Sequence, residues 1–444
     1  MKGPKVVLLG AGSMFFGRQC IWAMIHSDIL CNGTLALVDT DTDRLNKMTE
    51  LAKLAIKSRQ SPLKLEASAN RLDVLKNADF VVLSFADRGV YFRGVDCEVS
   101  EKYGVRMCSG DTIGPGGIFR AMRELPKILQ VTSDVENICP EAWVINYINP
   151  TAVNGIGLMR HAKVKSFALC DGLHMPHIKK RYMKEAGLNG KDEEKFDLRI
   201  AGVNHFTWML AANYDGKDVS NSIKEHITGL ASAEKDKGHS KEKFNNSYLL
   251  SLWDVFGLYP ACIAHTKEYV PFWQGKGVKK DKLPSLSIFD VKKRYHRHDE
   301  MWQEVDGYIN GTIPLEEFHD KHKPDHATDV IEAMWSGKKQ PFYINTKNNS
   351  SVENLPDDAF LELLCDIDMN GPKPRSSGKF PLGLRSMQMQ VLDTHELTVE
   401  AIVKKDRNLL RRAMCTDPIV LSIADSNAII NELLEREADA LCGG

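Results

Sequence analysis

The chain has 444 residues, 43% of them hydrophobic and 26% charged, and 58 basic against 59 acidic side chains leave a formal net charge of −1. This composition is that of an ordinary globular protein, and the lack of a basic excess argues against nucleic acid or an anionic membrane as the main partner. At roughly 100–200 residues per domain, the length predicts two or three domains.

The N-terminal segment leads directly into a short apolar run that ends at Gly10. This run is too short for a signal peptide and has no small-residue cleavage site. No apolar stretch reaches the roughly 20 residues that span a bilayer. The ten cysteines show no paired spacing, which favours free thiols over disulfides. We therefore expect a cytoplasmic protein.

Short apolar runs alternate with amphipathic stretches through the first 180 residues, a pattern typical of βαβ units around a parallel sheet. Helical periodicity is clear over residues 43–58 and 118–136. The expected buried strands are residues 6–9, 35–38, 80–83, 143–145 and 166–169. Because ligands bind at the carboxyl ends of the strands in open parallel sheets, the functional residues should follow these strands.

The first strand end carries a glycine-containing turn, GAGS at residues 10–13, followed by an apolar stretch over 15–25 that predicts the first helix. Glycines there let the backbone approach a pyrophosphate, which the helix N-terminus stabilises. Phe15 stands where the third glycine of the usual fingerprint would fall. Asp39 ends the second strand and can bind a ribose 2′-hydroxyl, which favours NAD over NADP. The alternative is a purely structural turn.

Two later strand-like segments carry potential metal ligands. Cys170 follows the run at 166–169, and His205 lies within a strand-like segment over 200–208. One thiolate and one imidazole can hold a divalent ion while leaving coordination positions open to substrate. A buried thiol and a hydrogen-bonded core histidine are the structural alternatives, and spacing alone does not decide between them.

Beyond residue 196 the pattern loosens into mixed strands and helices. We expect a solvated loop over the charged residues 233–243, a solvated helix face at the basic run 292–298, and a closing helical region over 393–441. The predicted fold class is α/β. A Rossmann-type doubly wound, NAD-binding domain would span residues 1–195, and a mixed α+β substrate-binding and oligomerisation domain would span residues 196–444.

Segments along nearly the whole chain, in this order, resemble the motifs of the family 4 glycoside hydrolases. They are GAGS at 10–13, SGDTIGPGGIFR at 109–120, YINP at 147–150, CD at 170–171, GVNH at 202–205, EYVP at 268–271, VENLP at 352–356 and ELTVEA at 396–401. A glycine turn alone is weak evidence, whereas a series of ordered matches is hard to obtain by chance.

The resemblance implies an NAD- and manganese-dependent glycosidase, an exception to hydrolysis by a carboxylate pair. NAD would oxidise carbon 3 of the sugar, a base would remove the acidified proton at carbon 2, and the leaving group would depart from carbon 1. Water would then add, and the cofactor would return its hydride. The implied substrate is a small α-glycoside of the α-glucoside or α-galactoside type, without phosphate. A 6-phospho-α-glucosidase and an α-uronidase are alternatives within the family.

The resemblance also implies roles for single residues. The residues implied to bind NAD are Gly10, Gly12, Ser13, Met14 and Asp39. Manganese would be held by Cys170 and His205. Tyr269 matches the base at carbon 2, with Tyr259 as the fallback, and Asp171 matches the acid that protonates the departing oxygen. Gly172-Leu173 stands where that branch of the family has Met-Pro, so a sugar-binding role is the alternative for Asp171.

The residues implied to contact sugar hydroxyls are Arg93, Asp111, Asn149 and Asn204. Arg93 is expected in a loop that lines the pocket, with a surface ion pair as the alternative. No motif of the family supports metal binding by His174 or His177. The expected partner is a small glycoside, with no nucleic acid and no membrane, and the resemblance implies a homodimer or homotetramer.

Two other classes of function are alternatives to the glycosidase. An NAD-dependent 2-hydroxy acid dehydrogenase has a first domain built in the same way, and it would release NADH with a 2-hydroxy acid. An NAD-binding sensor would show no turnover. The combination of Cys170, His205 and Tyr269 argues against the sensor.

Overall fold

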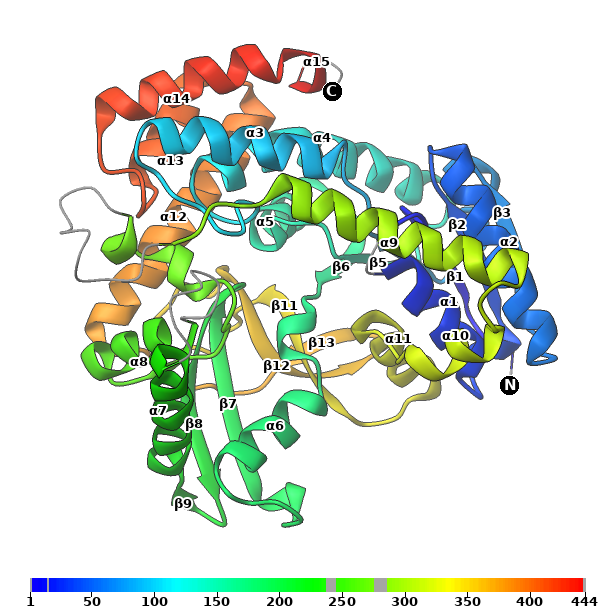
Figure 1. Cartoon of the computed structure of the whole chain (residues 1–444), viewed down its shortest axis with the longest axis horizontal. Helices are drawn as coiled ribbons and strands as arrows, with labels where there is room; N and C mark the ends of the chain where they lie inside the picture. Colours follow the sequence, from blue (N-terminus) through cyan, green and yellow to red (C-terminus); the bar gives the residue numbers. More distant parts are fainter. Residues whose placement is uncertain (1, 14–15, 237–244, 275–285, 442–444) are drawn as a thin grey trace.

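The computed structural model describes residues 2–13, 16–236, 245–274 and 286–441. In this part of the chain, strands from both halves of the sequence join one sheet in the order β3-β2-β1-β4-β5-β6-β11-β12-β7-β8-β10, with β13 beside β12 and β9 beside β8. Helices surround this sheet, and α9 packs beside α3 and α2 (Figure 1).

The first six strands are parallel and follow the order 3-2-1-4-5-6 of a dinucleotide-binding sheet. They are β1 (Lys5–Leu9), β2 (Thr34–Val38), β3 (Lys64–Ser68), β4 (Phe80–Leu83), β5 (Trp143–Asn146) and β6 (Lys165–Ala168). The helices of this region are α1 (Phe16–His26), α2 (Thr42–Ser58), α3 (Gly89–Lys102), α4 (Gly114–Ile138), α5 (Thr151–His161) and α6 (His177–Glu185). All five predicted strands and the three helices predicted here are confirmed, because β1, β2, β4 and β5 are continuous apolar runs buried on both faces.

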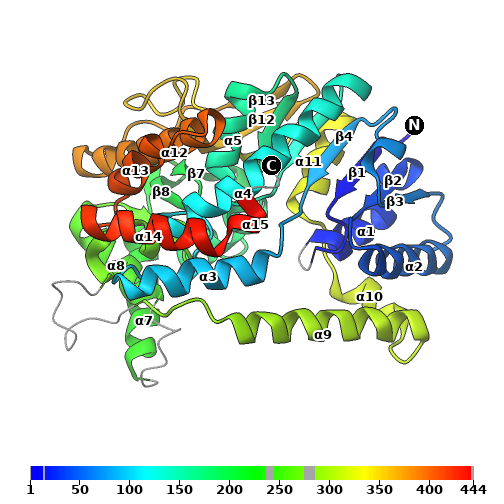
Figure 2. The same ribbon diagram turned by 90° about the horizontal axis from the view of Figure 1, so that it is seen from above.

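The remaining strands are antiparallel. They are β7 (Phe196–Val203), β8 (Phe206–Tyr214), β9 (Lys217–Asp218), β10 (Tyr259–Pro260), β11 (Pro341–Lys347), β12 (Phe360–Asp368) and β13 (Gly371–Pro374). The later helices are α7 (Ser220–Asp236), α8 (Asn245–Phe256), α9 (Val291–Asn310), α10 (Leu315–Lys321), α11 (His326–Ser336), α12 (Leu382–Lys404), α13 (Arg407–Thr416), α14 (Ile423–Arg436) and α15 (Ala438–Leu441). The view from above shows α12 to α14 gathered on the side away from β1 to β3 (Figure 2).

Two local predictions were wrong. The segment 200–208 is not one strand, because β7 and β8 form a tight hairpin whose two-residue turn is Asn204-His205. The charged stretch 233–243 is not wholly a loop, since α7 continues to Asp236. The rest of that stretch lies outside the described residues.

The predicted boundary between residues 195 and 196 falls immediately before β7. Across it the sheet is continuous, because β6 and β11 pair antiparallel through Ala168 and Asn345. The division into two domains therefore stays a prediction. Within the described ranges, no helix has both the length and the apolar character needed to cross a membrane.

Candidate active site

In the glycine turn after β1, the backbone of Gly10 lies close to the backbone of Ser84. Gly10 has φ +91°, and a Cβ atom there would lie 2.4 Å from the carbonyl oxygen of Ser84, so only glycine fits. The amide of Gly12 donates a 2.8 Å hydrogen bond to Oδ2 of Asp39 at the end of β2. The turn and Asp39, both predicted to bind NAD, are thus joined directly.

Gly17 supplies the close packing that the third glycine of the fingerprint would provide. A Cβ atom at Gly17 would lie 2.1 Å from the carbonyl oxygen of Ala11 and 2.8 Å from Cε of Met48. Sequence reasoning missed this glycine because it falls two residues after Phe15. Ser13 lies in the turn, where its amide donates to the carbonyl of Gly10 at 3.0 Å, and Met14 lies outside the described residues.

Cys170 and His205 meet although they lie on different elements. Cys170 follows β6 and His205 lies in the β7–β8 turn, and their Sγ and Nε2 atoms are 3.2 Å apart. A thiolate and an imidazole bind an ion such as zinc at roughly 2.3 and 2.0 Å, so both donor atoms can contact one divalent ion. No group of three or more histidine, cysteine or acidic residues in the described ranges could hold a metal. This pair would leave the other positions to substrate or water.

Burial disfavours the charged forms of both His205 and Cys170. Burial lowers the pKa of His205, which keeps the imidazole neutral and able to coordinate. Its ring stacks on that of His265, with centroids 3.9 Å apart, and Nδ1 has no hydrogen-bond partner among the described residues. Burial also raises the pKa of the Cys170 thiol, so an ion would have to displace its proton.

The main-chain carbonyls of the turn are held by side chains from the η5 segment (Thr266–Tyr269). The hydroxyl of Tyr269 donates to the carbonyl of Asn204 at 3.2 Å, and Oγ1 of Thr266 donates to the carbonyl of His205 at 3.4 Å. The side-chain amide of Asn204 donates to Oε2 of the buried Glu362 at 3.3 Å. Tyr269 therefore contacts the turn formed by Asn204 and His205.

Tyr269 is buried and stacks on Phe206, with ring centroids 5.1 Å apart. Burial raises the pKa of its phenol. Ionisation at neutral pH therefore needs a nearby cation. The fallback Tyr259 packs instead against Tyr182 and Trp253, and no contact described here ties it to His205.

Asp171 directly follows Cys170, and its Oδ1 accepts a 3.2 Å hydrogen bond from the hydroxyl of Tyr147. The residue reaches solvent, but desolvation of its carboxyl by the surrounding protein raises the pKa of Asp171. This direction suits a general acid. Nε2 of His174 lies 2.8 Å from Oδ2 of Asp329.

His326, at the start of α11, was missed by sequence reasoning. Its Nδ1 lies 3.2 Å from the carbonyl oxygen of Cys170. Its ring stacks on that of His174, with centroids 4.8 Å apart. No family motif marks this histidine, and only the fold brings α11 to the end of β6.

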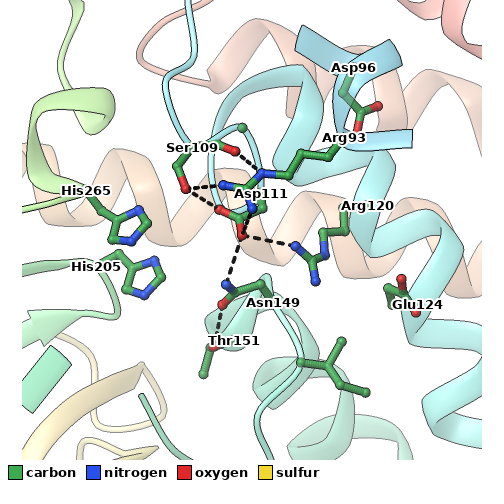
Figure 3. A network of polar contacts seen from close by, with 12 residues as sticks. Arg93, Asp96, Ser109, Asp111, Arg120, Glu124, Asn149, Thr151, His205 and His265 are labelled. Carbon is green, nitrogen blue, oxygen red and sulfur yellow. Dashed lines mark hydrogen bonds and ion pairs between the residues drawn. The ribbon is translucent and has the colours of Figure 1, made fainter. Parts of the chain in front are cut away.

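A second network surrounds the buried Asp111 (Figure 3). Its Oδ2 lies 3.1 Å from Nη1 of Arg120, 3.4 Å from Nη1 of Arg93 and 3.2 Å from Nδ2 of Asn149. Burial alone would raise the pKa of Asp111, but the guanidinium groups of Arg93 and Arg120 outweigh it and hold that pKa well below its usual range. Arg93 lies on α3, so the predicted loop position was wrong. Arg120 was missed as a site residue.

The two networks face each other, and the rings of His205 and His265 lie beside the Asp111 cluster in Figure 3. One residue of the basic run 292–298 also approaches this cluster. The guanidinium groups of Arg93 and Arg294 lie 4.1 and 5.8 Å from the centroid of the same Phe289 ring. Burial and the charge of Arg93 lower the pKa of Arg294. This end of α9 is therefore not a purely solvated face.

Comparison with known proteins agrees with this architecture. The sequence model described as "Family 4 glycosyl hydrolase" matches residues 5–187, and that of the "Family 4 glycosyl hydrolase C-terminal domain" matches residues 200–420. An alpha-galactosidase of Bacillus subtilis is 28% identical over 98% of this chain and 99% of its own length. An alpha-galacturonidase of Thermoanaerobacter italicus is 27% identical over 100% of this chain and 98% of its own length.

Solved structures share the fold. A 6-phospho-alpha-glucosidase from gut microorganisms, crystallised with NAD and Mn²⁺, superposes with a TM-score of 0.82 at 20% identity, over 99% of both chains. A 6-phospho-beta glucosidase of Thermotoga maritima, crystallised with manganese, NAD⁺ and glucose-6-phosphate, gives a TM-score of 0.78 at 20% identity, over 98% of this chain and 99% of its own. Both structures therefore support the predicted Rossmann-type α/β fold.

Proposed function

This chain belongs to family 4 of the glycosyl hydrolases, and on that premise we propose that it cleaves a small α-glycoside with the help of NAD and manganese. The observation that carries the proposal is the 3.2 Å approach of Cys170 to His205, in a turn that also contacts Tyr269. If the protein were a dehydrogenase of 2-hydroxy acids, its matches to the family 4 models over residues 5–187 and 200–420 would be unexplained.

NAD would be held by the turn that contains Gly10, Gly12 and Ser13, with Met14 beside it and Asp39 at the ribose. The tight turn supports this assignment, because φ +91° and the close Ser84 carbonyl admit only glycine at position 10, and the amide of Gly12 joins the turn to Asp39. When bound, NAD supplies a reversible hydride acceptor for carbon 3 of the sugar. The turn fixes the dinucleotide, and Asp39 selects an unphosphorylated ribose.

Manganese would be held by Cys170 and His205, whose donor atoms are spaced for one ion. Among the described residues, no third histidine, cysteine or acidic residue joins them as a ligand. When bound, a divalent ion supplies Lewis-acid stabilisation of negative charge that develops on the sugar oxygens. Thiolate is an unusual ligand for an ion that prefers oxygen. Added metal and a thiol reductant should therefore be required for full activity.

Tyr269 would remove the proton from carbon 2, and Asp171 would protonate the departing oxygen at carbon 1. The raised pKa of Asp171 keeps a proton available. The raised pKa of Tyr269 means that its phenol is neutral until a cation lies close by. Asn149, Asp111, Arg93 and Asn204 would orient the sugar hydroxyls.

For the substrate we favour an unphosphorylated α-hexoside of the galactoside or glucoside type, which the B. subtilis alpha-galactosidase supports. One observation favours a second candidate. The half-buried Arg93 and Arg120 both lie beside the carboxylate of Asp111, and guanidinium groups at this position would suit the carboxylate of an α-uronide. An alpha-galacturonidase among the relatives is consistent with that alternative.

The test is a panel of nitrophenyl glycosides in both anomers, with neutral, uronic and 6-phosphorylated sugars, assayed with NAD, manganese and thiol reductant. We expect nitrophenol release from an α-glycoside without accumulation of NADH. Accumulation of NADH from a 2-hydroxy acid, with no glycoside cleaved, would contradict the proposal. We also propose that the protein is cytoplasmic and forms a homodimer or homotetramer. Light scattering during gel filtration measures the molar mass and so tests the oligomeric state.

A further inference from the structure

We propose that Gln388 is a positioning residue that holds the His205 turn in place and thereby sets the affinity for manganese. The inference rests on the proposed function, because it takes His205 as a metal ligand. Gln388 lies on α12, far from the glycine turn and from the Asp111 network in sequence, and its side chain is fully buried.

The side-chain amide of Gln388 bridges the two arms of the β7–β8 hairpin. Its Oε1 accepts a 2.8 Å hydrogen bond from the amide of Val203, and its Nε2 donates a 2.8 Å hydrogen bond to the carbonyl of Phe206. Val203 and Phe206 are the register partners that flank the turn Asn204-His205. One side chain from another element therefore fixes both ends of the two-residue turn.

The backbone makes room for this amide. Gly202 precedes Val203 with φ +142°, and a Cβ atom there would lie 3.2 Å from Nε2 of Gln388 and 2.9 Å from the carbonyl oxygen of Phe206. A larger residue at Gly202 would therefore press on the bridging amide. The glycine of the GVNH motif thus has a physical reason, since its φ, the backbone of Phe206 and Thr207, and the amide of Gln388 together leave no room for a side chain.

The turn needs such support because its conformation is strained. His205 has φ +65°, a left-handed conformation that costs energy in a residue with a side chain. Tyr269 and Thr266 hold the carbonyls of Asn204 and His205, but only Gln388 among the described side chains bonds both arms. Without it, we expect the Nε2 atom of His205 to drift from Sγ of Cys170, which would separate the two ligands.

The experiment compares manganese binding, measured by electron paramagnetic resonance of the free ion, between the wild-type chain, Gln388→Met, Gln388→Glu and His205→Ala. Gln388→Met removes both hydrogen bonds at similar volume. Groups that orient metal ligands typically change metal affinity about 10- to 100-fold, so we expect at least a tenfold rise in the manganese Kd with NAD affinity within twofold. Gln388→Glu keeps the acceptor for Val203 and loses the donor to Phe206, so its effect should be intermediate.

Gln390→Met is the matched control, because Gln390 lies on the same helix, is exposed, and bonds only the carbonyl of Thr416. It should bind manganese as the wild type does. A Gln388→Met chain that folds and binds manganese with unchanged affinity would overturn the inference while leaving the proposed function standing. Loss of fold in both Gln388 variants would also overturn it, since that is the behaviour of a purely structural residue. If the wild-type chain binds no manganese, or His205→Ala binds it equally well, the proposed function itself fails.

Discussion

The hydroxyl of Tyr269 donates a 3.2 Å hydrogen bond to the main-chain carbonyl of Asn204, so the proposed base is attached to the turn that carries the proposed metal ligand His205. A tyrosine so close to the proposed metal ligands would be ionised more readily by a cation bound there.

Tyr269→Phe removes the proton acceptor and leaves the stacking on Phe206. We expect the rate of glycoside cleavage to fall about 100- to 10,000-fold, the usual value of general base catalysis. Exchange of the carbon 2 proton with solvent deuterium should be lost, while NAD and manganese bind normally. Tyr259→Phe is the control and should keep the exchange. Continued exchange in Tyr269→Phe would assign the base to another residue.

Asp39→Ala removes the carboxylate that orients Gly12 and is proposed to bind the ribose. Loss of hydrogen bonds to a charged group predicts a rise of about 10- to 100-fold in the Kd for NAD. Discrimination against NADP should also decrease, and manganese affinity should be unchanged. Fluorescence titration with both dinucleotides measures this. An equal loss of sugar affinity would contradict the ribose role.

Arg123 is a buried cation, 2.8 Å from Oδ2 of Asp96 and 2.5 Å from Oε2 of Glu437. Arg123→Met leaves two buried carboxyl groups without their cation. We expect the free energy of unfolding to fall by about 3–5 kcal/mol. Arg160→Met, which removes the exposed pairs with Asp358 and Glu396, should cost less than about 1 kcal/mol. Urea unfolding gives both values. Equal losses of unfolding free energy in the two variants would show that burial does not determine how much these ion pairs stabilise the fold.

Asp417 caps the start of α4, where its carboxylate oxygens accept the amides of Gly114 and Ile419. Burial raises the pKa of Asp417 to about 7, whereas an unfolded aspartate titrates near 3.9. Between about pH 4 and pH 7, Asp417 is protonated in the folded chain and ionised in the unfolded chain. The free energy of unfolding therefore falls as the pH rises through this range.

Asp417→Asn cannot ionise, so its stability should depend less on pH. From pH 5 to pH 8 we expect the wild type to lose about 2 kcal/mol relative to Asp417→Asn, beyond any constant cost of the lost acceptor. Thermal or urea unfolding at several pH values measures this difference. Parallel pH profiles for the two proteins would show that Asp417 is ionised in the folded protein.

The sequence predicted the parallel strands well because residues 6–9 and 80–83 are apolar runs buried on both faces. It missed the hairpin at residues 204 and 205 because the turn has neither Gly nor Pro and its flanks are apolar. Arg120 and Gln388 could not be placed from the sequence, since α4 and α12 reach the site only through long-range packing. Motif resemblance singled out Cys170, His205 and Tyr269 as candidates, and only the tertiary structure shows which residues hold them in place.

The most direct test of the account is cleavage of the preferred nitrophenyl α-glycoside in deuterium oxide, followed by nuclear magnetic resonance of the released sugar. If the sugar is oxidised at carbon 3 and deprotonated at carbon 2, the product carries deuterium at carbon 2, and its release stops when NAD or manganese is removed. Release of a sugar without deuterium at carbon 2, at a rate that does not depend on NAD or manganese, would contradict the account.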